Sequence, residues 1–429
     1  MQTIERPHRA RLKMGLIISA CCGFLLIFIE PYSGGYFKDW FIPLIGNYRI
    51  NLFEAFLIPI FYVSLMYYIH KGIQIKKSEQ ILYLSMILII FFRILSLIVA
   101  DNIETIQWIS IFRYIETLVV IYIFTNLFSD HKNRKFFIRG VIIGVIIETI
   151  GGIFVFLKTY YKGVFISNTS HILQVFLIIV CILVFMNRRH KFLMWVFILV
   201  IILAILASLS RTSWIFLVTS LLIFALVYSK KQALRNVLFF IAFAGIAVLL
   251  MGKILPSATD IFIIKSNEPF NIGGTTFYRF YLWDKALGSF LQNPILGIGS
   301  GSFGRQQENL PQLFNVELPG HYRKLNFQLT AHSTFFGILS ETGIIGLSVY
   351  LLWIIAIISI CRKAIQLSNI YSSHDKYIIA TTLIVISLIV FDIITKCSFT
   401  LISSIFIGFI CGWLREKNKI YSLKSFYIP

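Results

Sequence analysis

Apolar stretches of about 20 residues recur along this chain, and most of them are separated by short polar connections. In lipid the backbone must satisfy its own hydrogen bonds, and these Ile/Leu/Phe-rich stretches are too long for barrel strands. The pattern therefore predicts an all-α, polytopic integral membrane protein with about twelve transmembrane helices. The predicted spans cover residues 14–30, 52–69, 80–100, 106–128, 137–157, 171–187, 192–209, 213–229, 236–254, 333–360, 377–395 and 397–414.

One connection, residues 255–331, is much longer than the others and rich in aromatic residues. Loops of that length in a compact fold are usually functional or disordered, and the mixed composition favours an ordered one. Within it, the sequence predicts an amphipathic helix over 277–291, ended by Asn293-Pro294. The glycine-rich stretch 295–304 indicates a tight backbone path near a ligand or a helix end. The expected organisation is an N-terminal bundle of about nine spans over 1–254, the loop 255–331, and C-terminal spans with a tail over 332–429.

The composition agrees with a membrane protein, since 58% of the residues are hydrophobic. The net charge of +20 raises the possibility of nucleic-acid binding, but the basic residues gather in alternate short connections, such as Arg188, Arg189 and Lys191. This is the positive-inside bias of a membrane protein, so we expect both termini in the cytoplasm, the long loop outside, and no nucleic-acid partner.

Several ionisable residues fall inside predicted spans, where each is costly unless it is paired or hydrated. They are Arg93, Arg113, Glu116, Glu148, Glu341, Asp392 and Lys396. The spacing of Arg113/Glu116 and of Asp392/Lys396 allows each pair to neutralise itself along one helix face. Arg93 and Glu148 have no partner nearby in the sequence and could pair across helices. A proton relay is the alternative.

Three residues attract attention because the predicted topology places them on the same membrane face. Arg211 lies between two spans, Arg279 on the predicted loop helix, and His332 at the entry to a span. Each taken alone fits an ordinary interfacial or helix-end role. Together, two guanidinium groups suit a diphosphate, and an imidazole suits removal of a proton from a hydroxyl.

Three segments resemble the signature segments of the O-antigen ligase and O-antigen polymerase superfamily. They are SRTSW at 210–214, RFYLWDKALGSFLQNPILGIGSGSFG at 279–304 and HSTFFGILSETGIIGL at 332–347. The resemblance implies a GT-C-like, inverting glycosyltransferase that needs no metal or other cofactor. The implied donor is a glycan on undecaprenyl diphosphate, and the acceptor is the lipid A core or another lipid-linked repeat unit. Arg211 and Arg279 would hold the diphosphate, and His332 would take the proton of the acceptor hydroxyl.

One departure from the family pattern follows the histidine, where the family usually has Asn and this chain has Ser333. Glu341 lies nine residues after His332, on the opposite face of an ideal helix, so we expect a structural role for it, such as pairing with an arginine from another span. Residues for the acceptor side, which could equally be solvated loop charges, are Arg305, His321, Arg323 and Lys324.

Other functions fit parts of the pattern. A transporter or lipid flippase would suit twelve spans with buried charges, but the sequence shows no internal repeat. A structural or sensory membrane protein would not explain the grouping of Arg211, Arg279 and His332. The histidine after the loop favours a ligase in lipopolysaccharide biosynthesis at the bacterial inner membrane, with a polymerase as the alternative. Sugar specificity, acceptor and oligomeric state do not follow from the sequence.

Overall fold

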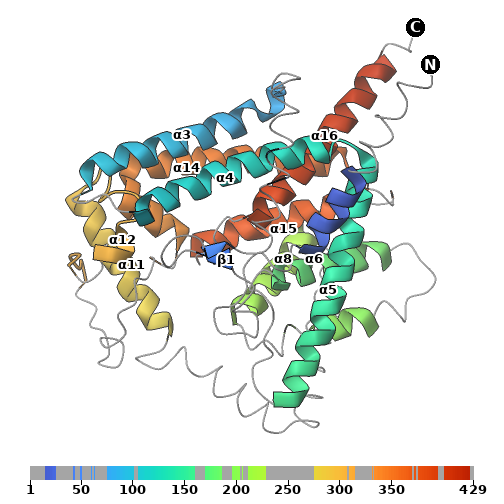
Figure 1. Ribbon diagram of the computed structural model, residues 1–429, viewed down its shortest axis with the longest axis horizontal. Coiled ribbons are helices and arrows are strands. Elements are labelled where there is room, and N and C mark those ends of the chain that lie inside the picture. Colours follow the sequence, from blue (N-terminus) through green and yellow to red (C-terminus); the bar gives the residue numbers. More distant parts are fainter. Residues whose placement is uncertain are drawn as a thin grey trace.

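A computed structural model gives the three-dimensional structure (Figure 1). The residues that it describes are 15–25, 42–43, 49–50, 59, 62, 75–100, 105–159, 170–185, 196–202, 205, 211–228, 275–306, 309–314, 331, 333–369, 372, 375–394 and 401–425.

The described residues are almost entirely helical, which confirms the all-α prediction at that level. The helices are η3 (Lys77–Glu79), α3 (Gln80–Ser96), η4 (Leu97–Val99), α4 (Thr105–Leu127), α5 (His131–Thr159), α6 (Ser170–Phe185), α8 (Arg211–Tyr228), α11 (Thr275–Gln292), α12 (Phe303–Gln306), α14 (Thr334–Leu367), α15 (Asp375–Ile394) and α16 (Leu401–Ser425). The described strands are β1 (Ile42–Pro43) and β2 (Arg49–Ile50), which form one short antiparallel pair.

The helices pack so that α14 and α15 connect the two sides of the bundle. Helices α3 and α4 pack against each other, α3 also packs along α14, and α4 packs along α16 (Figure 1). On the other side, α15 contacts α6 and α8. Helix α11, from the predicted loop, packs against α14. The loop helix therefore lies against the bundle, and it covers 275–292 where the sequence predicts 277–291.

The exposed side of helix α3 is apolar, while polar residues lie among the apolar ones on its buried side. Arg93 and Ser96 are buried, whereas Leu84, Phe91 and Ile94 on the opposite side are exposed. An outward apolar stripe with inward polar groups is the arrangement that a lipid environment favours.

Two described helices are long and apolar enough to cross a membrane, namely the Ser110–Leu127 part of α4 and α14. Shorter apolar helices occupy Gly15–Leu25, Gln80–Ser96, Ile172–Ile182 and Ile215–Phe224. The count of about twelve spans stays a prediction. The expected span at 236–254 lies outside the described residues, and so does most of 52–69.

Helix ends that the predicted topology assigns to the cytoplasm lie together in the structure. Arg415 lies within α16, just after the predicted span 397–414. It bonds to Glu79 before α3, with Nε and Oε1 2.7 Å apart, and to Asn126 at the end of α4, also at 2.7 Å. Arg134 at the start of α5 pairs with Glu416. These contacts join the starts of α3 and α5, the end of α4 and the middle of α16 in one polar group.

Helix α14 is broken at Gly343, whose φ of 65° and ψ of −163° are not helical. The glycine-rich segment after α11 lies against the break and satisfies the backbone groups that the break releases. Three backbone hydrogen bonds connect the two segments: Ile298 N–H to Ser340 O at 2.9 Å, Gly299 N–H to Glu341 O at 3.1 Å, and Ile344 N–H to Pro294 O at 2.9 Å. The tight backbone path predicted for 295–304 thus leads to a break within a helix.

We predict that Gly343→Ala destabilises the protein. The backbone conformation at Gly343 is nearly exclusive to glycine, which costs another residue about 1–3 kcal/mol. A Cβ there would also lie 2.3 Å from the Ile295 carbonyl oxygen. The matched control is Gly337→Ala on the same helix, because a Cβ at that position meets only the Ala331 Cβ, at 3.9 Å. The melting temperature of the detergent-solubilised protein should fall for Gly343→Ala alone; equal values for both variants would contradict this.

Candidate functional site

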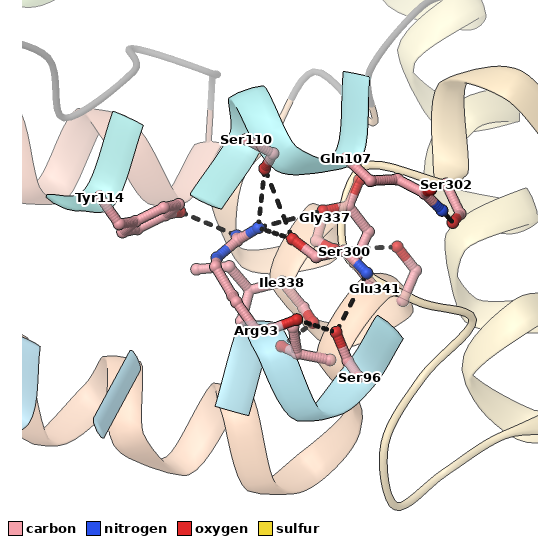
Figure 2. A network of polar contacts seen from close by, with 12 residues as sticks. Arg93, Ser96, Gln107, Ser110, Tyr114, Ser300, Ser302, Gly337, Ile338 and Glu341 are labelled. Carbon is pink, nitrogen blue, oxygen red and sulfur yellow. Dashed lines mark hydrogen bonds and ion pairs between the residues drawn. The ribbon is translucent and has the colours of Figure 1, made fainter. Parts of the chain in front are cut away.

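A polar network centred on Arg93 joins α3, α4, the glycine-rich segment and α14 (Figure 2). The guanidinium donates to Ser300 Oγ at 2.7 Å, to the Tyr114 hydroxyl at 2.8 Å and to Ser110 Oγ at 3.1 Å. Its Nη1 lies 3.4 Å from Oε2 of Glu341, with which it forms an ion pair. One buried cation thereby holds four separate segments together.

Two further contacts fix the glycine-rich segment in the same network. The backbone N–H of Ser300 donates to Ser96 Oγ at 3.0 Å, and Gln107 donates to Ser302 Oγ at 2.7 Å (Figure 2). The segment is therefore held by α3 and α4 on one side and by the break in α14 on the other. This explains the serines between its glycines: they supply hydrogen-bonding groups where the backbone is too close for larger side chains.

Helix α11 packs against the first part of α14 through aromatic side chains. The rings of Trp283 and Phe336 stack with centroids 5.2 Å apart. Ala331, Tyr278 and Leu282 belong to one hydrophobic cluster at this contact. Ala331 immediately precedes His332 in the sequence, and Tyr278 immediately precedes Arg279.

Two buried charged side chains of α11, Asp284 and Lys285, bind the part of the predicted loop at residues 310–314. Asp284 Oδ1 accepts hydrogen bonds from the backbone N–H groups of Leu313 and Phe314, both at 2.8 Å. The buried Lys285 ammonium donates to the Leu310 carbonyl. These buried charges therefore order part of the predicted loop.

The predicted site residues differ in how far the structure describes them. Arg279 is half-buried on α11. Arg211 is the first residue of α8 and Arg305 lies in α12, but their side chains are outside the described part of the chain. The residues that lie wholly outside the described residues are His321, Arg323, Lys324 and His332.

The flanks of His332 are described. Ala331 and Ser333 are both buried, and Ser333 Oγ caps α14 by accepting a hydrogen bond from Phe336 N–H at 3.4 Å. The residue that departs from the family pattern is therefore the N-cap of the helix.

Two of the pairings expected for charges within predicted spans are present in the described residues. Glu341 pairs with Arg93 of another helix, the kind of partner that the sequence suggested for it. Arg113 and Glu116 form the expected ion pair along α4, with Nη1 and Oε2 2.8 Å apart. The pairing of Asp392 with Lys396 stays a prediction, because Lys396 lies outside the described residues.

The sequence did not predict that Arg93 contacts the glycine-rich segment, or that Ser300 accepts its hydrogen bond there. The available signal was Arg93 itself, an arginine within a span with no partner on its own helix. For the part of the chain that the structure covers, no group of three or more His, Cys, Asp or Glu side chains could hold a metal ion.

We predict that Glu341→Gln destabilises the protein more than Glu116→Gln does. Both glutamates pair with an arginine, but the Arg93–Glu341 side chains are 6% and 16% exposed, against 52% and 29% for Arg113–Glu116. Removing one partner of a buried pair costs about 3–5 kcal/mol. The Arg113 side chain is not enclosed by the protein, so after loss of Glu116 it can extend toward the membrane surface, and we expect a smaller cost there. Thermal unfolding in detergent measures both; a greater loss for Glu116→Gln would contradict the expectation.

A comparison with protein families adds an independent finding. The family model described as O-antigen ligase matches residues 197–351. A search of curated proteins found no match for the chain. The matched stretch includes α8, α11, the glycine-rich segment and the first part of α14, whereas Arg93 lies outside it. The chain therefore matches the O-antigen ligase family over residues 197–351, which confirms its resemblance to the O-antigen ligase and polymerase superfamily.

Proposed function

We propose that the chain is a membrane glycosyltransferase of the ligase type, which moves a glycan from undecaprenyl diphosphate to a hydroxyl of an acceptor sugar. The observation that carries this proposal is the family match over 197–351, which contains Arg211, Arg279 and His332 in the order of the family's signature segments. We expect a bacterial inner-membrane protein with both termini in the cytoplasm and the reaction on the outer face.

Packing between α11 and α14 supports a common site for Arg279 and His332. Trp283, one turn after Arg279, stacks on Phe336, which is four residues after His332. The ends of the same two segments meet again at the glycine-rich contacts with 340–344. The two segments therefore run in the same sense, which supports our proposal that Arg279 and His332 belong to one site.

Contacts of α15 support the placement of Arg211 near the same end. Phe216 of α8 meets Phe391 of α15 with ring centroids 5.7 Å apart. The next residue, Asp392, accepts a hydrogen bond from Thr334 Oγ1 at 2.7 Å. The start of α8 is thus connected through α15 to the start of α14.

In the proposed reaction the acceptor hydroxyl attacks C1 of the donor sugar as His332 removes its proton. The bond between C1 and the diphosphate oxygen breaks, and undecaprenyl diphosphate leaves with the electron pair. Arg211 and Arg279 stabilise the charge that develops on the diphosphate, a role that a divalent ion often fills elsewhere. Attack opposite the leaving group inverts the configuration at C1. No metal or cofactor takes part in this scheme.

The acceptor that we propose is the lipid A core, with Arg305, His321 and Arg323 on the acceptor side of the site. A polymerase, in which the acceptor is a second lipid-linked repeat unit, shares the same donor chemistry. The glycan profile of a deletion strain separates the two. Loss of long polysaccharide from the lipid anchor with accumulation of lipid-linked polymer supports a ligase, single-repeat products support a polymerase, and an unchanged profile contradicts both.

A further inference from the structure

Asp392 is a fully buried carboxylate on α15, with 0% of its surface exposed. Thr334 Oγ1 donates to its Oδ1 and the Tyr350 hydroxyl donates to its Oδ2, each at 2.7 Å. Both donors belong to α14 and lie on opposite sides of the break at Gly343. A single carboxylate therefore binds two parts of one helix.

Only the break makes this double contact possible. In a straight α-helix, residues 334 and 350 would be about 24 Å apart along the axis, beyond the reach of one carboxylate. With the backbone of Gly343 outside the helical region, the arm that begins at Thr334 folds back toward the arm that contains Tyr350. Asp392 bonds to both arms, and the glycine-rich segment packs against the break itself.

We propose that Asp392 is a positioning residue, which holds the first arm of α14 and thereby places His332 for proton removal. Thr334 is the first residue of α14, Ser333 caps it, and His332 precedes the cap in the sequence. This inference rests on the proposed function, in which His332 is the base. Burying a carboxylate is costly, so packing alone would favour an apolar residue here. The two hydrogen bonds from hydroxyl groups explain why a carboxylate stands here, because they connect the two arms of α14 across the break.

The test uses the full chain in proteoliposomes, with the undecaprenyl-diphosphate-linked glycan isolated from the deletion strain as donor. Thr334→Val keeps the shape of the side chain but removes the hydrogen bond to Asp392. A small displacement of a catalytic group costs up to about 100-fold in rate, so kcat should fall by roughly 10- to 100-fold, while KM for the donor stays within about 3-fold. Thr334→Ser restores the hydroxyl and should recover most of kcat.

The matched control is Thr382→Val on α15, because among the described residues the Thr382 hydroxyl bonds within its own helix, to the Ile378 carbonyl at 2.7 Å. It should behave like the unaltered protein. Tyr350→Phe releases the second arm and should lower kcat in the same way, which keeps the test available if one variant does not fold.

A full kcat in folded Thr334→Val, a loss expressed only in KM, or a failure of Thr334→Ser to recover kcat would overturn the inference. Measuring His332→Ala in the same assay separates the two proposals. If His332→Ala is active, the proposed mechanism fails. If His332→Ala is inactive while Thr334→Val is fully active, only the positioning role fails.

Discussion

Replacement of His332 by alanine should lower glycan transfer by about 10²–10⁴-fold, the usual contribution of a general base. The acceptor hydroxyl is a weak nucleophile until its proton is removed, and the imidazole is the group that we assign to this step. Donor binding should persist, because the diphosphate is assigned to Arg211 and Arg279. The effect should therefore appear in kcat, with KM for the lipid-linked donor nearly unchanged.

The measurement is the rate of acceptor glycosylation by purified protein in proteoliposomes. A matched control is His131→Ala, since His131 begins α5 at the end of the bundle where the predicted cytoplasmic helix ends meet. It should transfer glycan at the normal rate. Normal transfer by correctly folded His332→Ala would remove the histidine from the mechanism.

Arg279→Ala and Arg211→Ala should each lower transfer by about 10²–10³-fold. Each variant removes a charged donor aimed at the leaving diphosphate. Lysine at either position keeps the charge but loses the two-pronged geometry that suits a diphosphate, so it should recover only part of the rate. Binding of undecaprenyl diphosphate itself should weaken together with kcat, unlike the result for His332.

The control for these variants is Arg113→Ala, which breaks an ion pair on the partly exposed side of α4. It should leave both transfer and diphosphate binding within a few-fold of normal. Unchanged diphosphate binding in both Arg211→Ala and Arg279→Ala would contradict the assigned roles.

The helical elements could be predicted from the sequence because their signals are local. The loop helix is an example: a turn before it and Asn293-Pro294 after it delimit a stretch that the structure shows as Thr275–Gln292. The Arg113–Glu116 pair was predictable for the same reason, since residues three apart share one helix face.

Contacts between distant segments could not be predicted in the same way. The sequence marked Arg93 and Glu341 as charges that need partners, but only the fold brings α3 to α14. The break at Gly343 was also hidden, because a glycine within an apolar stretch is compatible with an intact helix. For Asp392, the i, i+4 spacing pointed to Lys396, whereas the hydrogen bonds to Thr334 and Tyr350 depend on the break.

The central claim is that this chain transfers a glycan from undecaprenyl diphosphate with His332 as the base. The most direct measurement supplies the purified protein with that donor and with lipid A core, and follows both the glycosylated acceptor and the released undecaprenyl diphosphate. The account predicts equal amounts of the two products from the unaltered protein and almost none from folded His332→Ala. Absence of transfer to lipid A core and to a second lipid-linked repeat alike, or equal transfer by His332→Ala, would contradict it.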